Sequence, residues 1–217
     1  MGQTVKKLME QKDTNGLRKT LTDNPILANE GITIPYDFFC RTKAHPLHRI
    51  CDAVIAHKMT DDEAINLAKI FLEFGADING YNDGSPLLAA SSLHAEQLGI
   101  FYIDNGANVN ITDKNDKASA LHWAAFCGRD KLVDKLIKSN AAIDEPDKTY
   151  QSTPLGWAIH CLSSNDESNR HNQLGCIKLL IKAGADIKKL RVEAKENLNS
   201  FADNDTELKN ILKHTNA

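Results

Sequence analysis

Residues 119–141 read SALHWAAFCGRDKLVDKLIKSNA, and related segments recur three times along the chain. The start of this stretch has relatives in HPLHRICDA (45–53), SPLLAASSL (85–93) and TPLGWAIHC (153–161). Each start is followed by an apolar stripe and a short terminator, namely LEFGADIN (72–79), YIDNGANVN (102–110), IKSNAAID (137–144) and LIKAGADIK (180–188). The unit therefore occurs four times, and self-similarity of this kind predicts a repeat architecture.

Each copy carries the signals of a helix start and a helix stop. Ser85, Ser119 and Thr153 are good N-caps, since their hydroxyls accept from free N–H groups, and a proline follows two of them. The terminators place Gly75, Gly106, Asn140 and Gly184 after the apolar stripes. At these positions a helix ends in a left-handed residue, which Gly adopts most easily and Asn next. Each copy is thus predicted to hold helices that stack on their neighbours.

This pattern resembles the ankyrin repeat, whose signature is T-P-L-H-x-A with a period of about 33 residues. The resemblance covers roughly residues 44–190. It implies an all-α solenoid of stacked helix pairs with projecting β-turn or hairpin loops and helical caps at both ends. We expect one domain over 1–217, divided into an N-terminal cap with a degenerate repeat and long loop (1–43), repeats at 44–82, 83–116, 117–150 and 151–190, the last with an insertion, and a C-terminal helical cap (191–217).

Three segments depart from the period. Thr60 and Glu63 form a capping box, which predicts that the second helix of the first repeat begins after Thr60. Ser164 and Glu167 offer a weaker box in the insertion of the last repeat. The loop at 30–45 carries Tyr36, Phe38 and Phe39, which either cover the N-terminal cap or face a partner.

One cluster has the ligand types of zinc: Cys40, His45, His48 and Cys51 lie within twelve residues of each other. His48 and His122, however, occupy the histidine slot of the signature, where the resemblance implies that the ring ties the helix start to the preceding turn. Cys51 falls in a small-residue slot and is expected to pack inward. We therefore expect no metal and no other cofactor, and keep a metal-sensing or redox-sensing regulator built on the same scaffold as the alternative.

Composition excludes several other classes. The charge of −3 and the mixed signs along the chain offer no basic stripe to nucleic acid. No run of about 18 apolar residues could span a membrane. Five cysteines without a CxxC pair indicate reduced thiols and a cytoplasmic protein. No nucleophile–base–orienter arrangement and no catalytic motif is present, so we predict that the chain is not an enzyme.

The resemblance implies a protein-binding module, an adaptor or inhibitor that is a monomer when free. Its contacts come from the turn tips and the end of each first helix. The tip positions here are Tyr81, Asn82, Asn115, Asp116, Tyr150 and Gln151, and the helix positions are Ser92, Leu93, Phe126, Cys127, His160 and Cys161. Trp123 and Trp157 follow the histidine slot and are predicted to pack between repeats, with an aromatic binding ladder as the alternative. The partner itself is not identified.

Overall fold

The computed structural model describes residues 2–37, 39, 41–81, 84–164 and 172–215, which form two compact units, 1–108 and 109–217. The described residues are predominantly helical, and their only sheet has two strands of two residues each. The expected all-α fold of stacked helix pairs is therefore confirmed. The division into one domain of 1–217 with the repeat boundaries given above stays a prediction.

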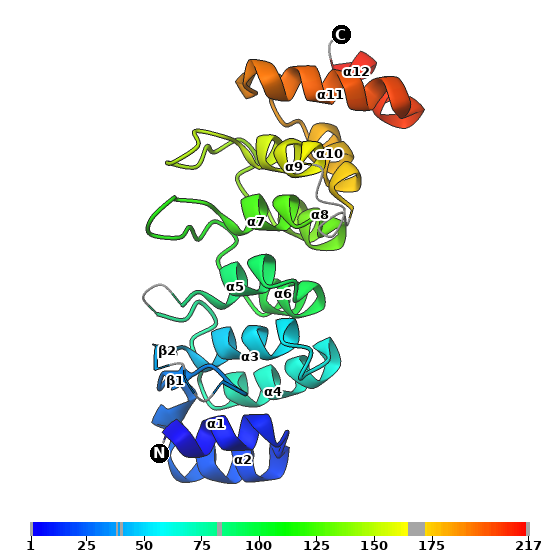
Figure 1. Cartoon of the computed structure of the whole chain (residues 1–217). Helices are drawn as coiled ribbons and strands as arrows, with labels where there is room; N and C mark the ends of the chain where they lie inside the picture. The colour runs from blue at the N-terminus through cyan, green and yellow to red at the C-terminus, as the bar shows by residue number, and fades with distance from the viewer. Residues whose placement is uncertain (1, 38, 40, 82–83, 165–171, 216–217) are drawn as a thin grey trace. The chain divides into compact units, whose positions relative to one another are not determined.

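The first unit contains three helix pairs, which follow one another in Figure 1 from blue to green. They are α1 (Gly2–Glu10) with α2 (Thr14–Asp23), α3 (Pro46–Ile55) with α4 (Asp61–Glu73), and α5 (Pro86–Ser92) with α6 (Glu96–Asp104). A 3-10 turn η1 (Pro25–Ala28) and two strands, β1 (Ile32–Thr33) and β2 (Lys43–Ala44), lie between the first two pairs. The strands pair antiparallel, with Ile32 opposite Ala44. Helix α3 packs against α5, and α4 against α6.

The second unit repeats this arrangement (Figure 1). Its helices are α7 (Ala120–Phe126), α8 (Asp130–Lys138), α9 (Pro154–Ser163), α10 (Gln173–Lys182), α11 (Val192–Asn204) and α12 (Thr206–Thr215), with a 3-10 turn η3 (Ile187–Lys189) before α11. Helix α7 packs against α9, α8 against α10, and α11 against α9. The first helices of successive repeats therefore line up beside each other, as do the second helices.

The helix boundaries follow the predicted signals. Ser85, Ser119 and Thr153 are the N-caps of α5, α7 and α9, and each hydroxyl accepts from the backbone N–H three residues on. The Thr60–Glu63 capping box is formed at the start of α4. In the first repeat His45 takes the capping position, its Nδ1 accepting from Leu47 N at 3.3 Å.

The helix ends also match the sequence. Gly75, Gly106, Asn140 and Gly184 all have positive φ, at 81°, 88°, 63° and 95° respectively. In each case the following alanine donates its N–H to the carbonyl five residues before it, as in Ala141 N to Leu136 O at 3.0 Å. This is the six-to-one bond of a Schellman motif, and it satisfies a carbonyl that the helix leaves free.

Consecutive turns are joined by one recurring side-chain bond. A side-chain oxygen near the end of one repeat accepts a backbone N–H from the next, over 2.7–3.0 Å. The pairs are Asn29 with Asp77 N, Asn79 with Asn108 N, Asn110 with Ala142 N, and Asp144 with Asp186 N. We call these four bonds the turn ladder. They fix the register of neighbouring turns without a continuous sheet.

Two expectations about the irregular segments need correction or completion. The box at Ser164 is not used, because Ser164 is the C-cap of α9 and the next helix is capped by Asn172; Glu167 lies outside the described residues. In the loop, Tyr36 covers the N-terminal cap, its hydroxyl donating to Glu10 O at 2.9 Å. Phe39, by contrast, is 92% exposed, and Phe38 lies outside the described residues. Tyr36 therefore covers the N-terminal cap, whereas Phe39 does not.

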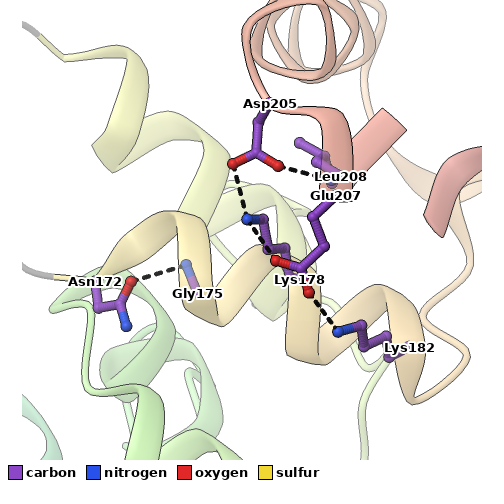
Figure 2. A network of polar contacts seen from close by, with 7 residues as sticks. All are labelled: Asn172, Gly175, Lys178, Lys182, Asp205, Glu207 and Leu208. Atoms are coloured by element: carbon purple, nitrogen blue, oxygen red, sulfur yellow. Dashed lines mark hydrogen bonds and ion pairs between the residues drawn. The ribbon is translucent and has the colours of Figure 1, made fainter. Parts of the chain in front are cut away.

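The C-terminal helix is held to α10 by charged side chains (Figure 2). Lys178 Nζ contacts Asp205 Oδ2 at 2.8 Å and Glu207 Oε2 at 2.9 Å, and Lys182 Nζ contacts Glu207 Oε1 at 2.8 Å. Burial alone would lower the pKa of Lys178, but the two carboxylates raise it overall. The network therefore favours the charged form of a side chain that is only 16% exposed.

We expect Lys178→Met to loosen α12, because it leaves Asp205 and Glu207 facing each other without their shared cation. The free energy that holds α12 in place should fall by about 1 kcal/mol, the upper range for ion pairs at a partly exposed site. Hydrogen exchange of the α12 amides measures it, with Lys209→Met, which removes only a more exposed pair with Asp203 at 3.2 Å, as the control. Equal protection of α12 in both variants would contradict the prediction.

Candidate functional site

A cleft of about 480 Å³ opens in the second unit, between the ends of α7 and α9, the start of α11 and the turn that precedes α9. Its walls include four aromatic side chains: Trp123, Phe126, Tyr150 and Trp157. Its rim includes polar side chains from separate elements: Asp116, His160, Arg191, Glu193 and Asn197. Aromatic walls with a few convergent polar groups are the usual composition of a binding site.

Trp157 is the centre of the aromatic wall. Its ring lies edge-to-face against Trp123 at 5.1 Å between centroids, Phe126 at 5.8 Å and Tyr150 at 6.0 Å, with interplanar angles of 82°, 75° and 77°. Such pairs contribute about 0.5–1.5 kcal/mol each beyond area burial. Because the rings come from two repeats and the turn between them, the prediction that both tryptophans pack between repeats is confirmed.

Asp147 fixes the turn that carries Tyr150. The carboxylate is fully buried and accepts from Tyr150 N at 2.5 Å, Ser152 N at 3.0 Å and Trp157 Nε1 at 2.9 Å. Burial would raise the pKa of Asp147, but these three donors lower it overall. One carboxylate therefore positions both the turn and the central indole of the cleft.

His122 is a second buried residue that fixes the turn carrying Tyr150. Ser119 N donates to its Nδ1 at 3.1 Å, so Nε2 carries the proton and donates to Ser152 O at 3.1 Å. The ring thus bonds to Ser119, which pairs with Thr112 in the preceding turn, as expected, and it also ties the start of α7 to the following turn. Its ring also lies edge-to-face on Trp157 at 5.3 Å.

The structure brings four of the predicted contact residues together. Asp116, Phe126, Tyr150 and His160 all line the cleft. Tyr150 is 56% exposed and His160 is exposed, while Phe126 is half-buried because it leans on Trp123 and Trp157.

The remaining predicted residues fall elsewhere. Asn115 and Gln151 are exposed in the turns before α7 and α9. Tyr81, Ser92 and Leu93 belong to the first unit, where Tyr81 is 39% exposed and the other two are half-buried; Asn82 lies outside the described residues. Cys127 and Cys161 are buried and do not line the cleft, and their assignment as partner-binding residues stays a prediction.

Sequence reasoning missed the side of the cleft that α11 provides. Arg191, Glu193 and Asn197 lie beyond the last repeat period, in a helix that the sequence identified only as a cap. No repeat signal marks them, because α11 follows the last copy of the signature. The buried acid Asp147 was also missed, although a carboxylate six residues before the helix N-cap is a recognisable turn signal.

The cysteine–histidine cluster has structural roles where it is described. His45 Nε2 bonds to Asn29 Oδ1 at 3.0 Å, and the Cys51 thiol lies against the carbonyls of Leu47 and Pro86 at 3.6 and 3.7 Å. Burial raises the pKa of the Cys51 thiol, and burial raises that of Cys127 to about 11. Within the described ranges, no three His, Cys, Asp or Glu side chains are placed to hold a metal ion, and Cys40 lies outside them.

Buried histidines predict a loss of stability in mild acid. Burial lowers the pKa of His45 to about 4 and lowers those of His48 and His122. The unfolded chain therefore takes up protons below about pH 6.5 that the folded chain refuses. We expect the free energy of unfolding to fall by about 2 kcal/mol between pH 7.5 and pH 4.5.

Urea unfolding at the two pH values measures this loss. His45→Asn retains a side chain that can cap α3 and should reduce the pH dependence. His57→Asn is the matched control, since His57 is exposed and should leave the pH dependence unchanged. If the free energy of unfolding of His45→Asn fell between the two pH values as much as that of the parent chain, His45 would not carry the effect.

Comparison with known proteins identifies the repeats. The family model "Ankyrin repeats (3 copies)" matches residues 87–191. Human palmitoyltransferase ZDHHC13 is 36% identical over 110 residues, covering 46% of this chain and 16% of the relative. Mouse ankyrin repeat and SOCS box protein 6 is 26% identical over 130 residues, covering 59% and 29%, and Drosophila melanogaster palmitoyltransferase Hip14 is 31% identical over 84 residues, covering 39% and 12%.

The chain spans less than a third of the length of these curated relatives. None of the helices in the described ranges combines the length and the apolar character needed to cross a bilayer. The matched region contains α6 to α10, with the capped starts at Ser119 and Thr153, the left-handed ends at Gly106, Asn140 and Gly184, and two bonds of the turn ladder. Residues 87–191 are therefore ankyrin repeats.

Proposed function

We propose that the chain is an adaptor or inhibitor that binds a protein partner, and that the aromatic cleft of the second unit receives an extended segment of that partner. Ankyrin repeats are protein-interaction modules. The observation that carries the proposal is the cleft itself, in which four aromatic side chains meet polar groups from α9, from the start of α11 and from the turns before α7 and α9.

The cleft is suited to binding because its walls are already ordered. Asp147 and His122 fix the turn around Tyr150 and Trp157 through buried hydrogen bonds. Binding of a partner segment would therefore lose little conformational entropy on this side of the interface. Half-exposed aromatic side chains in such a pocket are typical anchors of an interface.

The names of the relatives do not change this proposal. Two of them are palmitoyltransferases, but the similarity covers 16% or less of their length. The ankyrin fold is typically a non-catalytic interaction scaffold, and we propose no catalytic activity for this chain. The metal-sensing or redox-sensing alternative has no support, since His45 and Cys51 are occupied by capping and packing.

Selection of a random peptide library against the chain tests the proposal. His160→Ala should weaken selected peptides at least tenfold and leave the thermal midpoint almost unchanged, because the side chain is exposed. Tyr150→Ala should weaken them as much with a small loss of stability, because its exposed ring also packs on Trp157. Phe126→Leu should weaken binding too, with some loss of stability. Glu196→Gln, on an exposed part of α11 outside the cleft, is the control. Failure to select any peptide, or peptides that tolerate all three cleft variants, would overturn the proposal.

A further inference from the structure

The rim of the cleft carries carboxylates that no cation neutralises within the described residues. Asp116 is half-buried and uses one oxygen to accept from Thr149 Oγ1 at 2.5 Å. Glu193 is exposed in the first turn of α11. Neither takes part in any of the ion pairs found in the described ranges.

The cation on the same rim is already directed elsewhere. The guanidinium of Arg191 donates through Nη2 to the carbonyl oxygen of Tyr150. It therefore secures α11 to the turn that carries Tyr150, and because the carbonyl is neutral the guanidinium keeps its charge. The rim then holds two carboxylates and one guanidinium, which is a net negative charge, and neither carboxylate is ion-paired with it. An acidic segment entering the cleft would meet these carboxylates unpaired, which disfavours it.

The aromatic walls, like the carboxylates, favour a positively charged ligand. Trp123, Phe126 and Tyr150 each stand at 75–82° to Trp157. Rings set at steep angles around one indole turn their faces in several directions, and a ring face attracts cations. Tryptophan is the strongest of these partners, and arginine is the cation that most often uses them.

We propose that the cleft recognises an arginine side chain of an extended partner segment. This inference rests on the proposed function and adds the chemistry of the partner. A guanidinium is planar, so it stacks on an aromatic face while its N–H groups point outward toward carboxylates. Lysine offers a compact, strongly hydrated charge without a plane to stack, so it fits the walls less well.

The same library selection supplies the test, in which the residues enriched at each position of the selected peptides are compared. We expect an arginine at one fixed position of the selected peptides. A synthetic peptide with citrulline there, which keeps the shape and removes the charge, should bind at least tenfold more weakly. Trp123 and Trp157 are the only two tryptophans of the chain, so their fluorescence reports binding at the cleft itself.

Variants of the rim separate this inference from the proposed function. Asp116→Asn with Glu193→Gln should weaken the arginine peptide at least fivefold and leave the citrulline peptide unchanged, whereas Glu196→Gln should affect neither. Cleft-binding peptides without an enriched arginine would overturn the inference and leave the proposed function standing. If the rim variant bound the arginine peptide as tightly as the parent chain does, the inference would also be overturned and the proposed function would stand. A selection that yields no peptide would overturn both.

Discussion

Replacing Trp157 by Ala should lower the free energy of unfolding by about 3–5 kcal/mol, the range for removing a large aromatic side chain from a packed site. The indole is 8% exposed and contacts four other rings, from His122, Trp123, Phe126 and Tyr150. Its loss also removes one of the three donors to the buried carboxylate of Asp147. Both effects act in the same direction.

Urea unfolding followed by far-UV circular dichroism measures this change without relying on the tryptophan signal. Trp157→Phe is the matched variant, since it keeps a six-membered ring against the neighbouring aromatics and removes the indole N–H together with the five-membered half of the ring system. Its loss should be smaller, about 1–3 kcal/mol, the cost of a buried hydrogen-bond partner left unmade. If Trp157→Ala unfolded at the same urea concentration as the parent chain, the aromatic wall would not be a packed unit.

The second large effect is expected at Tyr102, in the first unit. Its side chain is fully buried, and its hydroxyl donates to the carbonyl of Leu47 at 2.8 Å. The bond links α6 to α3, the first helix of the preceding pair. Tyr102→Ala should therefore cost about 3–5 kcal/mol through the cavity that it leaves.

Tyr102→Phe isolates the contribution of the hydroxyl. It keeps the ring and leaves the Leu47 carbonyl without this partner, which should cost about 1–2 kcal/mol. Both variants are compared with the parent chain by chemical denaturation. A loss in Tyr102→Phe as large as in Tyr102→Ala would mean that the ring contributes little, against the burial seen in the structure.

Local signals explain why so much of the fold could be predicted. A hydroxyl before a helix and a left-handed residue after it act through the backbone nearby, so Ser119 and Asn140 were placed correctly from sequence alone. Thr60 was placed for the same reason. Ser164 shows the limit of such signals, because a capping motif is a local preference that tertiary structure overrides.

The cleft was predicted only in part, since it depends on contacts between repeats. The period placed Phe126, Tyr150 and His160 on comparable faces, and the structure brings them into one cleft. The period contains no information about how far Phe126 leans toward Trp157. It also cannot reach α11, whose residues obey no repeat and whose position depends on packing against α9.

The turn ladder has a consequence for how such a chain can change in length over evolution. Its four bonds join residues that are 29, 32, 42 and 48 positions apart, yet each makes the same contact between successive turns. The longest span carries most of its additional residues in the loop before α3, which contains β1 and β2, whereas the span from Asp144 to Asp186 carries its additional residues between α9 and α10. A gene can therefore gain or lose codons at either edge of a repeat while the bond between successive turns is preserved.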